Sequence, residues 1–487
     1  MAVLEAAVAE PARAVELGTL LVVAAYAFTG LVSPLLGPRL ARLSLYASTG
    51  VALAAAAYAT LRIAPLGGYV VGFDGAVVVD TFAVYMLSTA VIVFALAAVA
   101  ARGVVDRWEA GEAFYAVAGL MALGIIMLGL SRVLYLVYIA WILAAVSSYV
   151  LIALYRDDWS AEAAMKYAVT GAVATIVLLL GVILYYTVAG SLAISDRLLV
   201  RDPLLVTPVV TLLAVAVGFK MGVVPFHGWL VDVYGNARPL VVAIASAAAK
   251  VLAALLIVRL IAPFAAATPE IVLWVASVLA VITMTYGNVG ALLTVRDSPQ
   301  KMLAYSSVAQ AGYILAAVAA LAKLPGVDNQ AAIAGIAIHT SAYVLSKLAA
   351  FLALDAGCRY PGCSWEQLRG LAWSRPYAAA ALTVAAANLA GAPLTLGFWG
   401  KLYIVLAAVS ASKLLAAAAV ANIAVSAFYY GYLIYQLFLP RRGGGEWQVS
   451  TRELAAAAAA LLTIVLALAP QQGYGLAVYA YTPAAPP

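Results

Sequence analysis

The sequence predicts an all-α polytopic membrane protein with about 14 transmembrane helices. Hydrophobic residues make up 66% of its 487 residues and charged residues only 10%, whereas a soluble domain is about half apolar and about a quarter charged. Apolar stretches recur along the whole chain without alternating ten-residue strands, so helices rather than a β-barrel are expected to satisfy the backbone. The net charge of +6 comes from basic residues scattered singly between apolar runs, which is not the pattern of a nucleic-acid-binding protein.

The predicted helices follow from the length that a membrane requires, about 20 apolar residues. Stretches of this kind lie near 17–36, 44–64, 79–101, 113–130, 133–154, 166–190, 204–226, 240–262, 270–294, 302–323, 331–354, 377–407, 411–437 and 454–470. We expect four units: helices 1–3 over 1–112, helices 4–8 over 113–262, helices 9–13 over 270–437, and a loop with helix 14 over 438–487.

Lysine and arginine in the connecting loops predict the orientation. They are more numerous on the side of the membrane opposite to the two termini, and short loops rich in these residues stay on the cytoplasmic side. We therefore expect both termini to lie outside a prokaryotic cell membrane.

Four lysines lie inside predicted helices, at Lys220, Lys250, Lys347 and Lys401. A lysine at the middle of a transmembrane helix costs about 2.5–3.5 kcal/mol on insertion scales. Near a helix end the ammonium can reach the headgroups, but Lys250 is central in its span and has Ser246 one turn earlier on the same face. Hydrogen bonding between helices is one explanation. Cations spread over four helices favour an ion path.

Two of these lysines, Lys220 and Lys401, lie close to breaks in long apolar segments. The breaks are Gly222-Val223-Val224-Pro225 and Gly391-Ala392-Pro393. Proline removes a backbone donor, and the carbonyls freed by a break are tolerated in a membrane only where protein or a watery cavity meets them. Paired broken helices are typical of inverted-repeat transporters. We therefore predict two inverted five-helix repeats, helices 4–8 and 9–13, with the breaks in helices 7 and 12.

Both histidines of the chain lie on or beside lysine-bearing helices. His339, Tyr343 and Lys347 are spaced by four residues and line one face of the eleventh helix. His227 and Asp232 follow the first break, at Pro225, and histidine titrates near neutrality as a proton relay requires. A loop or capping role is the alternative for His227.

Metal binding has little support, because His, Cys and carboxylates do not cluster at ligand spacing. Cys358 and Cys363, in the loop sequence CRYPGC, could form a local disulfide or nothing. Their two sulfurs are too few for a zinc site.

Several motifs resemble the antiporter-like membrane subunits of respiratory complex I, membrane-bound hydrogenases and Mrp-type cation/proton antiporters. The resemblance runs from about residue 80 to residue 437. It is clearest in the segments KMGVVPFHGWLVDVYGNARPLVVAIASAAAK, TYGNVGALL, KMLAYSSVAQAGY, NLAGAPLTLGFWGKLYIV and AVSAFYYGYLIY. The stretch SAEAAMKYAVTGAVAT and the lysine at 401 look most like the N-type subunit.

The resemblance implies a role for each buried lysine. Lys220 would change protonation, Lys250 would pass the proton inward, and Lys401 would connect to the outside. The stripe of His339, Tyr343 and Lys347 would be the central wire. The subunit would hold no redox cofactor, and quinone and redox cofactors would belong to the other membrane-arm and peripheral subunits of a quinone oxidoreductase that uses NADH or another donor.

The sequence departs from the family at the fifth helix, where a glutamate usually stands beside the seventh-helix lysine. Here the stretch reads WILAAVSSY and the position is Ile142, so Lys220 lacks the carboxylate that would favour its ammonium form. This departure keeps a second hypothesis open, a structural membrane-arm subunit that does not pump. A third is a subunit of a Mrp-type antiporter or a membrane-bound hydrogenase, which share the same motifs.

Overall fold

The computed structural model describes residues 2–63, 68–194, 199–200, 202–265, 268–322, 329–440 and 449–478. Of the loop cations that predict the orientation, Arg197, Arg201, Lys323, Arg441 and Arg442 lie outside the described residues, as does part of the predicted unit 438–487.

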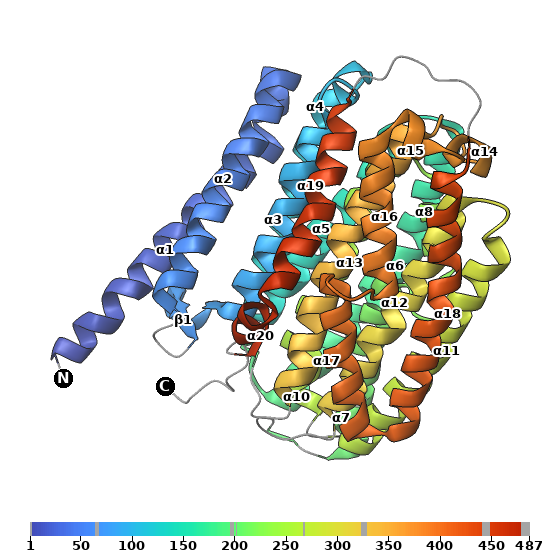
Figure 1. Ribbon diagram of the computed structural model, residues 1–487. Coiled ribbons are helices and arrows are strands. Elements are labelled where there is room, and N and C mark those ends of the chain that lie inside the picture. The colour runs from blue at the N-terminus through green and yellow to red at the C-terminus, as the bar shows by residue number, and fades with distance from the viewer. Residues whose placement is uncertain are drawn as a thin grey trace.

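The described chain is almost entirely helical (Figure 1). Its N-terminal part contains α1 (Ala2–Leu31), η1 (Ser33–Leu36), α2 (Pro38–Ile63), β1 (Tyr69–Gly72), η3 (Phe73–Gly75), β2 (Val77–Asp80), α3 (Thr81–Ala101) and η4 (Val105–Arg107). The middle part contains α4 (Gly111–Leu130), α5 (Leu134–Ala153), α6 (Asp158–Ala189), α7 (Pro203–Met221), α8 (Gly228–Asn236), α9 (Pro239–Leu256), the π-helical turn η5 (Ile257–Ile261) and α10 (Ala262–Ala265).

The C-terminal part begins with two long helices that pack against each other, α11 (Pro269–Thr294) and α12 (Pro299–Leu321). It continues with α13 (Asn329–Gly357), α14 (Trp365–Leu368), α15 (Leu371–Ser374), α16 (Pro376–Ala390), α17 (Leu396–Ala411), α18 (Lys413–Phe438), α19 (Thr451–Val465), η7 (Leu466–Leu468) and α20 (Pro470–Val478).

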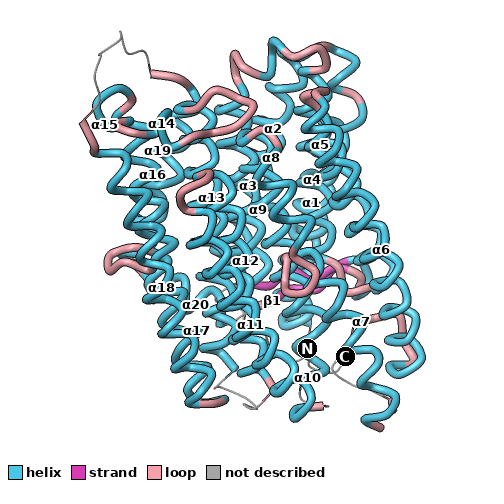
Figure 2. The backbone as a smooth tube through the Cα atoms, turned by 90° about the vertical axis from the view of Figure 1, so that its right-hand side faces the viewer, coloured by secondary structure: helices cyan, strands magenta, loops and turns pink. Residues whose placement is uncertain are grey.

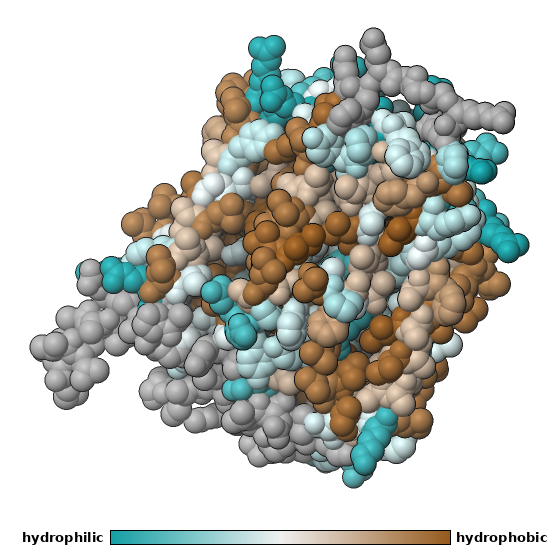
Figure 3. Space-filling view, in the orientation of Figure 1, coloured by the Kyte–Doolittle hydropathy of each residue, from teal (hydrophilic) through white to brown (hydrophobic). Residues whose placement is uncertain are grey.

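The predicted spans are present as helices. In the described part, 13 helices are long and apolar enough to cross a membrane, and the remaining expected span, 377–407, is divided into the shorter α16 and α17. The polypeptide is therefore a multi-pass membrane protein, and brown apolar side chains cover much of the face seen in Figure 3.

Both predicted breaks are confirmed. Helix α7 ends at Gly222 and α16 ends at Gly391, and each of these glycines has a left-handed φ, of 73° and 88°. Glycine adopts this conformation without the steric penalty that other residues incur, so each half-helix can end inside the bundle. Pro225 and Pro393 follow in the two breaks and are exposed.

Other local features differ from the sequence expectation. The segment after α2 forms a two-stranded antiparallel hairpin, β1 with β2, and Asp80 at its end caps α3 by accepting a hydrogen bond from Ala83 N. Helix α6 begins at Asp158 rather than near 166, because the Asp157 side chain caps it through Ser160 N. Such caps satisfy free N–H groups at a helix start and lengthen the helix beyond its apolar stretch.

The centre of the bundle consists of α9, α12 and α13. In the apolar stretches that could cross a membrane, 100% of the residues of α9 and α13 and 89% of those of α12 are buried inside the protein. The corresponding share is only 28% in α1 and in α2. Figure 1 shows α1 and α2 standing to one side. Figure 2 shows, as Figure 1 does, that the start of α1 lies at the opposite end of the bundle from α14 and α15. Of these three helices, α9 carries Lys250 and α13 carries the stripe of His339, Tyr343 and Lys347.

Helices α13 and α17 approach each other most closely at Gly400. A Cβ atom added there would lie 2.6 Å from His339 Cα, which is shorter than a backbone contact allows. We expect Gly400→Ala to lower the free energy of unfolding by about 1–3 kcal/mol, as overpacking does. Thermal unfolding in detergent measures this effect. Gly431→Ala on α18 is the matched control, because a Cβ there meets nothing within 4 Å; an equal effect of both changes would contradict the prediction.

Candidate functional site

Lys220 lies in the last turn of α7 and is buried, with 3% of its surface exposed. Its Nζ donates hydrogen bonds to Tyr167 Oη at 3.0 Å and Ser148 Oγ at 3.4 Å. The same Nζ lies 5.7, 5.4 and 5.0 Å from the ring centroids of Trp141, Tyr149 and Tyr167. Aromatic faces attract cations at such distances. We call these four residues of α5 and α6 the aromatic cage of Lys220.

The cage is held in place by contacts across the first break. Tyr167 stacks on Trp229 of α8, with ring centroids 4.3 Å apart and planes 3° apart. Trp229 Nε1 donates a hydrogen bond to Phe219 O at 3.0 Å, so the carbonyl beside Lys220 fixes the ring that supports Tyr167. Gly171 leaves room for Tyr149, since a Cβ there would lie 1.9 Å from Tyr149 Oη.

In the described part of the chain, no carboxylate forms an ion pair with Lys220 in place of the glutamate whose position Ile142 occupies. None of the ion pairs between described residues includes Lys220, Lys250, Lys347 or Lys401. Ile142 is a partly buried residue packed against the apolar core. The rings and hydroxyls of the cage occupy the surroundings of Lys220 instead, and the sequence reasoning did not identify them.

Lys250 lies on α9 with 1% of its surface exposed. Its Nζ donates a hydrogen bond to Met221 O, the last carbonyl of α7, and lies 5.4 Å from the ring centroid of Tyr343. The hydroxyl of Ser246 donates its hydrogen bond to Ala243 O of the same helix, at 3.2 Å, rather than to a partner of Lys250. The break in α7 thus supplies the acceptor for the lysine of α9.

The predicted stripe on α13 lies beside Lys250. Lys347 is fully buried, and its Nζ donates to Leu303 O at 2.6 Å and Ser306 Oγ at 2.7 Å on α12. Its Nζ lies 5.7 Å from the Tyr343 ring centroid. Lys250 and Lys347 therefore both contact the Tyr343 ring.

Lys401 lies on α17, beyond the second break, and is 4% exposed. Its Nζ donates to Leu389 O at 2.6 Å and Ala390 O at 3.1 Å, and it lies 4.9 Å from the Tyr313 ring centroid. Tyr313 in turn packs edge-on against His339, with ring centroids 5.8 Å apart. Aromatic contacts thus connect Lys401 to the stripe on α13.

Lys250 and Lys401 have the same electrostatic setting. Each places its ammonium at the last carbonyls of a half-helix, α7 for Lys250 and α16 for Lys401. The C-terminal end of a helix carries partial negative charge and free carbonyls, so it favours a cation. Broken helices of membrane transporters hold ions in this way.

Among the described residues, several buried side-chain polar atoms near Lys250 and Lys401 have no hydrogen-bond partner. They belong to α12 and α13, and comprise Gln310 Oε1, Tyr313 Oη, His339 Nδ1, His339 Nε2, Thr340 Oγ1 and Tyr343 Oη. Buried polar groups are nearly always hydrogen-bonded to protein or to water, and a polar site with several partners can hold water. This group of atoms can therefore organise water between the stripe and Lys401.

The residues that follow the first break do not join the buried lysines. His227 packs edge-on against Tyr286, with ring centroids 4.3 Å apart. Asp232 is exposed and pairs with Lys166 at 3.3 Å. These contacts place both residues toward the rim of the bundle.

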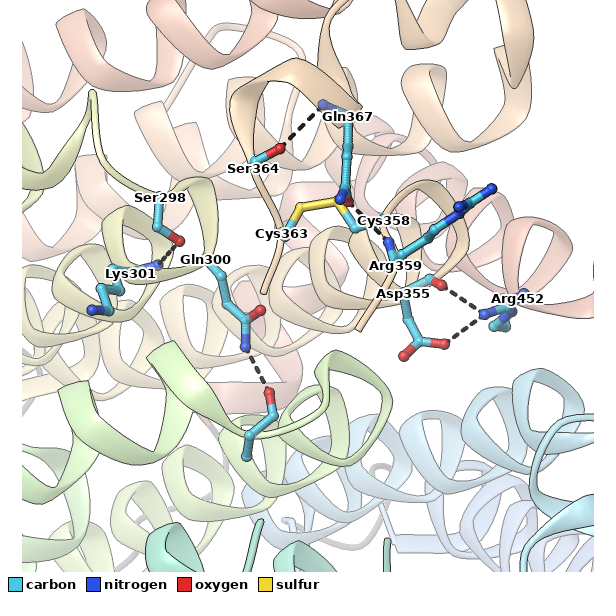
Figure 4. The surroundings of a disulfide bond; sticks show 11 residues. Ser298, Gln300, Lys301, Asp355, Cys358, Arg359, Cys363, Ser364, Gln367 and Arg452 are labelled. Atoms are coloured by element: carbon cyan, nitrogen blue, oxygen red, sulfur yellow. Dashed lines mark hydrogen bonds and ion pairs between the residues drawn. A yellow bond between two sulfur atoms is a disulfide. The ribbon is translucent and has the colours of Figure 1, made fainter. Parts of the chain in front are cut away.

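Two further expectations concern metals and cysteines. Within the described ranges, no group of three or more His, Cys, Asp or Glu side chains could hold a metal ion. Cys358 and Cys363, whose pairing the sequence left open, form a disulfide in the loop after α13 (Figure 4). Their Cα atoms are 5.2 Å apart, within the range of about 4.4–6.8 Å that a disulfide spans.

Comparisons with known proteins show which family and which solved structures the chain is similar to. Residues 131–426 match the family described as NADH:quinone oxidoreductase/Mrp antiporter, transmembrane. The chain is 36% identical over 420 residues to NADH-quinone oxidoreductase subunit N of Rubrobacter xylanophilus, covering 82% of this chain and 83% of that protein. It is similar to a chain of respiratory complex I from Thermus thermophilus, with 27% identity, a TM-score of 0.78, and coverage of 94% of this chain and 100% of that one.

A second solved structure shows the same fold in another assembly. A chain of the Mrp complex from Dietzia matches with a TM-score of 0.82 and 24% identity, over 95% of this chain and 96% of that one. At this identity the likeness concerns the fold.

Proposed function

Because the chain belongs to the NADH:quinone oxidoreductase/Mrp antiporter transmembrane family, we propose that it is the N-type, proton-translocating subunit in the membrane arm of a complex I-like quinone oxidoreductase. Electrons flow through other subunits, which bind quinone and the redox cofactors, and protons cross through this one. The likeness to subunit N of Rubrobacter xylanophilus and to a chain of Thermus complex I supports this assignment over a Mrp or hydrogenase subunit.

The observation that carries the proposal is the set of four buried lysines, with buried tyrosines and polar atoms near them. Lys220 lies in the last turn of α7, and Lys250 donates a hydrogen bond to the carbonyl of the next residue, Met221. The Tyr343 ring lies near both Lys250 and Lys347, and the Tyr313 ring lies near Lys401.

These residues define a path with distinct roles. Lys220 accepts a proton within its cage, Lys250 passes it to the stripe of His339, Tyr343 and Lys347, and Lys401 releases it on the other side. His227 and Asp232 assist the entry of protons near the first break. Pro225 and Pro393 prevent α7 and α16 from continuing as helices across the two breaks. Moving one charge against 100 mV costs about 2.3 kcal/mol, which the partner subunits must supply.

We extend the proposal to symmetry and orientation. Helices α4–α9 and α11–α18 form two inverted repeats, which the two glycine-ended breaks and their ammonium contacts support. The subunit lies in a prokaryotic cell membrane with both termini outside, and the arginine-rich end that carries α14 and α15 faces the cytoplasm. The excess of lysine and arginine in the loops of that end supports this orientation.

Proton transfer by the assembled complex with Lys220→Ala tests the function. In vesicles, we expect the number of protons moved per electron to fall by the share of this subunit, because a buried protonatable group of the path is lost. Lys413→Ala is the control, since Lys413 is exposed at the start of α18. An unchanged proton-to-electron ratio in a fully assembled complex would identify the chain as a structural subunit that does not pump.

A further inference from the structure

A charged cavity lies at the arginine-rich end of the bundle, away from the row of buried lysines. Its volume is about 590 Å³, and its wall includes Arg107, Arg156, Arg238 and Arg452 against one carboxylate, Glu109. The four arginines come from the turn after α3, the end of α5, the start of α9 and the start of α19. Segments distant in sequence thus bring four cations to one cavity.

The carboxylates near the cavity do not neutralise it. Arg156 pairs with Glu109 at 3.0 Å, but both side chains are more than half exposed, and such pairs contribute little. Arg238 and Arg452 pair with the same carboxylate, Asp355, at 3.2 and 2.8 Å. One carboxylate balances one guanidinium, so Arg238 and Arg452, which are both largely buried, together retain a surplus positive charge.

The two inner arginines are held in fixed positions. The Arg238 guanidinium lies 5.3 Å from the ring centroid of Trp108 and 4.6 Å from that of Tyr155. Arg452 Nη1 donates to both the backbone and the side chain of Asp355, while its Nε is buried and has no hydrogen-bond partner among the described residues. Donors that are already ordered lose less entropy when they bind a ligand.

The cavity lies beside the ends of apolar spans at Ala101 and Ala153 and the start of another at Thr451, so we expect it near the level of lipid headgroups. It adjoins a second cavity of about 350 Å³ that shares Arg238 and Arg452 and is walled on its far side by the Cys358–Cys363 loop. Figure 4 shows Asp355 facing Arg452 beside this disulfide. A polar ligand can therefore approach from the membrane surface or from the aqueous loops.

We propose that this cavity binds a phosphate group, either that of an anionic phospholipid headgroup or free phosphate. Guanidinium groups present planar forks of donors that match phosphate oxygens, and the surplus charge of the Arg238–Arg452 pair attracts an anion. This inference is independent of the proton path, since none of the path lysines lines the cavity.

The test uses the purified full-length chain and two probes. Phosphatidylglycerol is compared with phosphatidylcholine by native mass spectrometry of the lipid that the protein retains, and inorganic phosphate is titrated in detergent by equilibrium dialysis. Arg107→Gln is the informative variant, because Arg107 is exposed and joins none of the ion pairs between described residues. Arg369→Gln is the control, an exposed arginine near α14 that does not line either cavity.

We expect Arg107→Gln to weaken binding of the preferred probe about tenfold, as loss of one charge-assisted hydrogen bond does, and Arg369→Gln to have no effect. Selective retention of phosphatidylglycerol identifies a lipid headgroup as the ligand, and saturable binding of inorganic phosphate identifies free phosphate. The proposal is overturned if the wild-type chain prefers neither probe. It is also overturned if the two arginine variants behave alike.

Discussion

Tyr167→Phe is expected to lower proton transfer through this subunit by about tenfold or more in the assembled complex. The change removes the 3.0 Å hydrogen bond from Lys220 Nζ to the Tyr167 hydroxyl and leaves the ring in place. Hydrogen bonds that involve a charged group contribute about 1.5–3 kcal/mol, and Lys220 forms no ion pair with a carboxylate of the described residues. The ammonium form of Lys220 therefore becomes harder to reach. Proton uptake and electron transfer measured together in vesicles give the result.

A second substitution makes this prediction specific. Ile142 lies seven residues before Tyr149 on α5, so both share a helix face, and the Tyr149 ring is 5.4 Å from Lys220 Nζ. Adding Ile142→Glu to Tyr167→Phe should therefore restore much of the proton transfer, because a carboxylate near a buried ammonium stabilises its charge.

The control for the hydroxyl is Tyr186→Phe on the same helix, because the Tyr186 side chain is 49% exposed. Normal proton transfer in Tyr167→Phe would show that Lys220 does not depend on its cage. Failure of Ile142→Glu to improve the variant would show that the cage does not substitute for a carboxylate.

The fold was predictable from the sequence to the extent that single segments determine it. An apolar stretch of membrane length forms a helix wherever it occurs, and Gly222 and Gly391 with their following prolines mark the ends of half-helices. The π-helical turn at Ile257–Ile261 and the β1–β2 hairpin have no comparable local signal. They form where neighbouring elements pack, as Arg259 of the turn shows by binding Asp80 at the end of β2.

The four buried lysines were predictable as residues, but their surroundings were not. A charge within an apolar run is visible in any sequence. The hydrogen-bond partners of Lys220 are Ser148 and Tyr167, which lie 72 and 53 residues away in the sequence. The stretch WILAAVSSY contains three members of the cage, Trp141, Ser148 and Tyr149, but their role depends on the packing of α5 against α6 and α7.

Asp355→Ala is expected to lower the free energy of unfolding by about 3–5 kcal/mol, the cost of leaving buried charges without their partner. The side chain of Asp355 is 2% exposed and pairs with Arg238 and Arg452. Its Oδ1 also accepts a hydrogen bond from Leu240 N at the start of α9. Asp355 thus joins α13 to α9 and α19, eight residues beyond Lys347 on the helix that carries the stripe. Thermal unfolding in detergent and the yield of assembled complex measure the loss.

A graded series separates charge from hydrogen bonding at this position. Asp355→Asn keeps the Oδ1 that accepts from Arg238 Nε and Leu240 N. It removes the negative charge and puts an amide nitrogen, which can only donate, in place of the Oδ2 that accepts from Arg452 Nη1. Because part of the hydrogen bonding survives, its loss should be smaller than that of Asp355→Ala. Asp297→Ala is the control, because Asp297 is exposed in a loop and surface changes of this kind stay within about 0.5 kcal/mol. If Asp355→Ala unfolds at the wild-type temperature, the two arginines do not depend on this carboxylate. Helix α13 would then be held by its other contacts, such as the hydrogen bonds of Lys347 to α12.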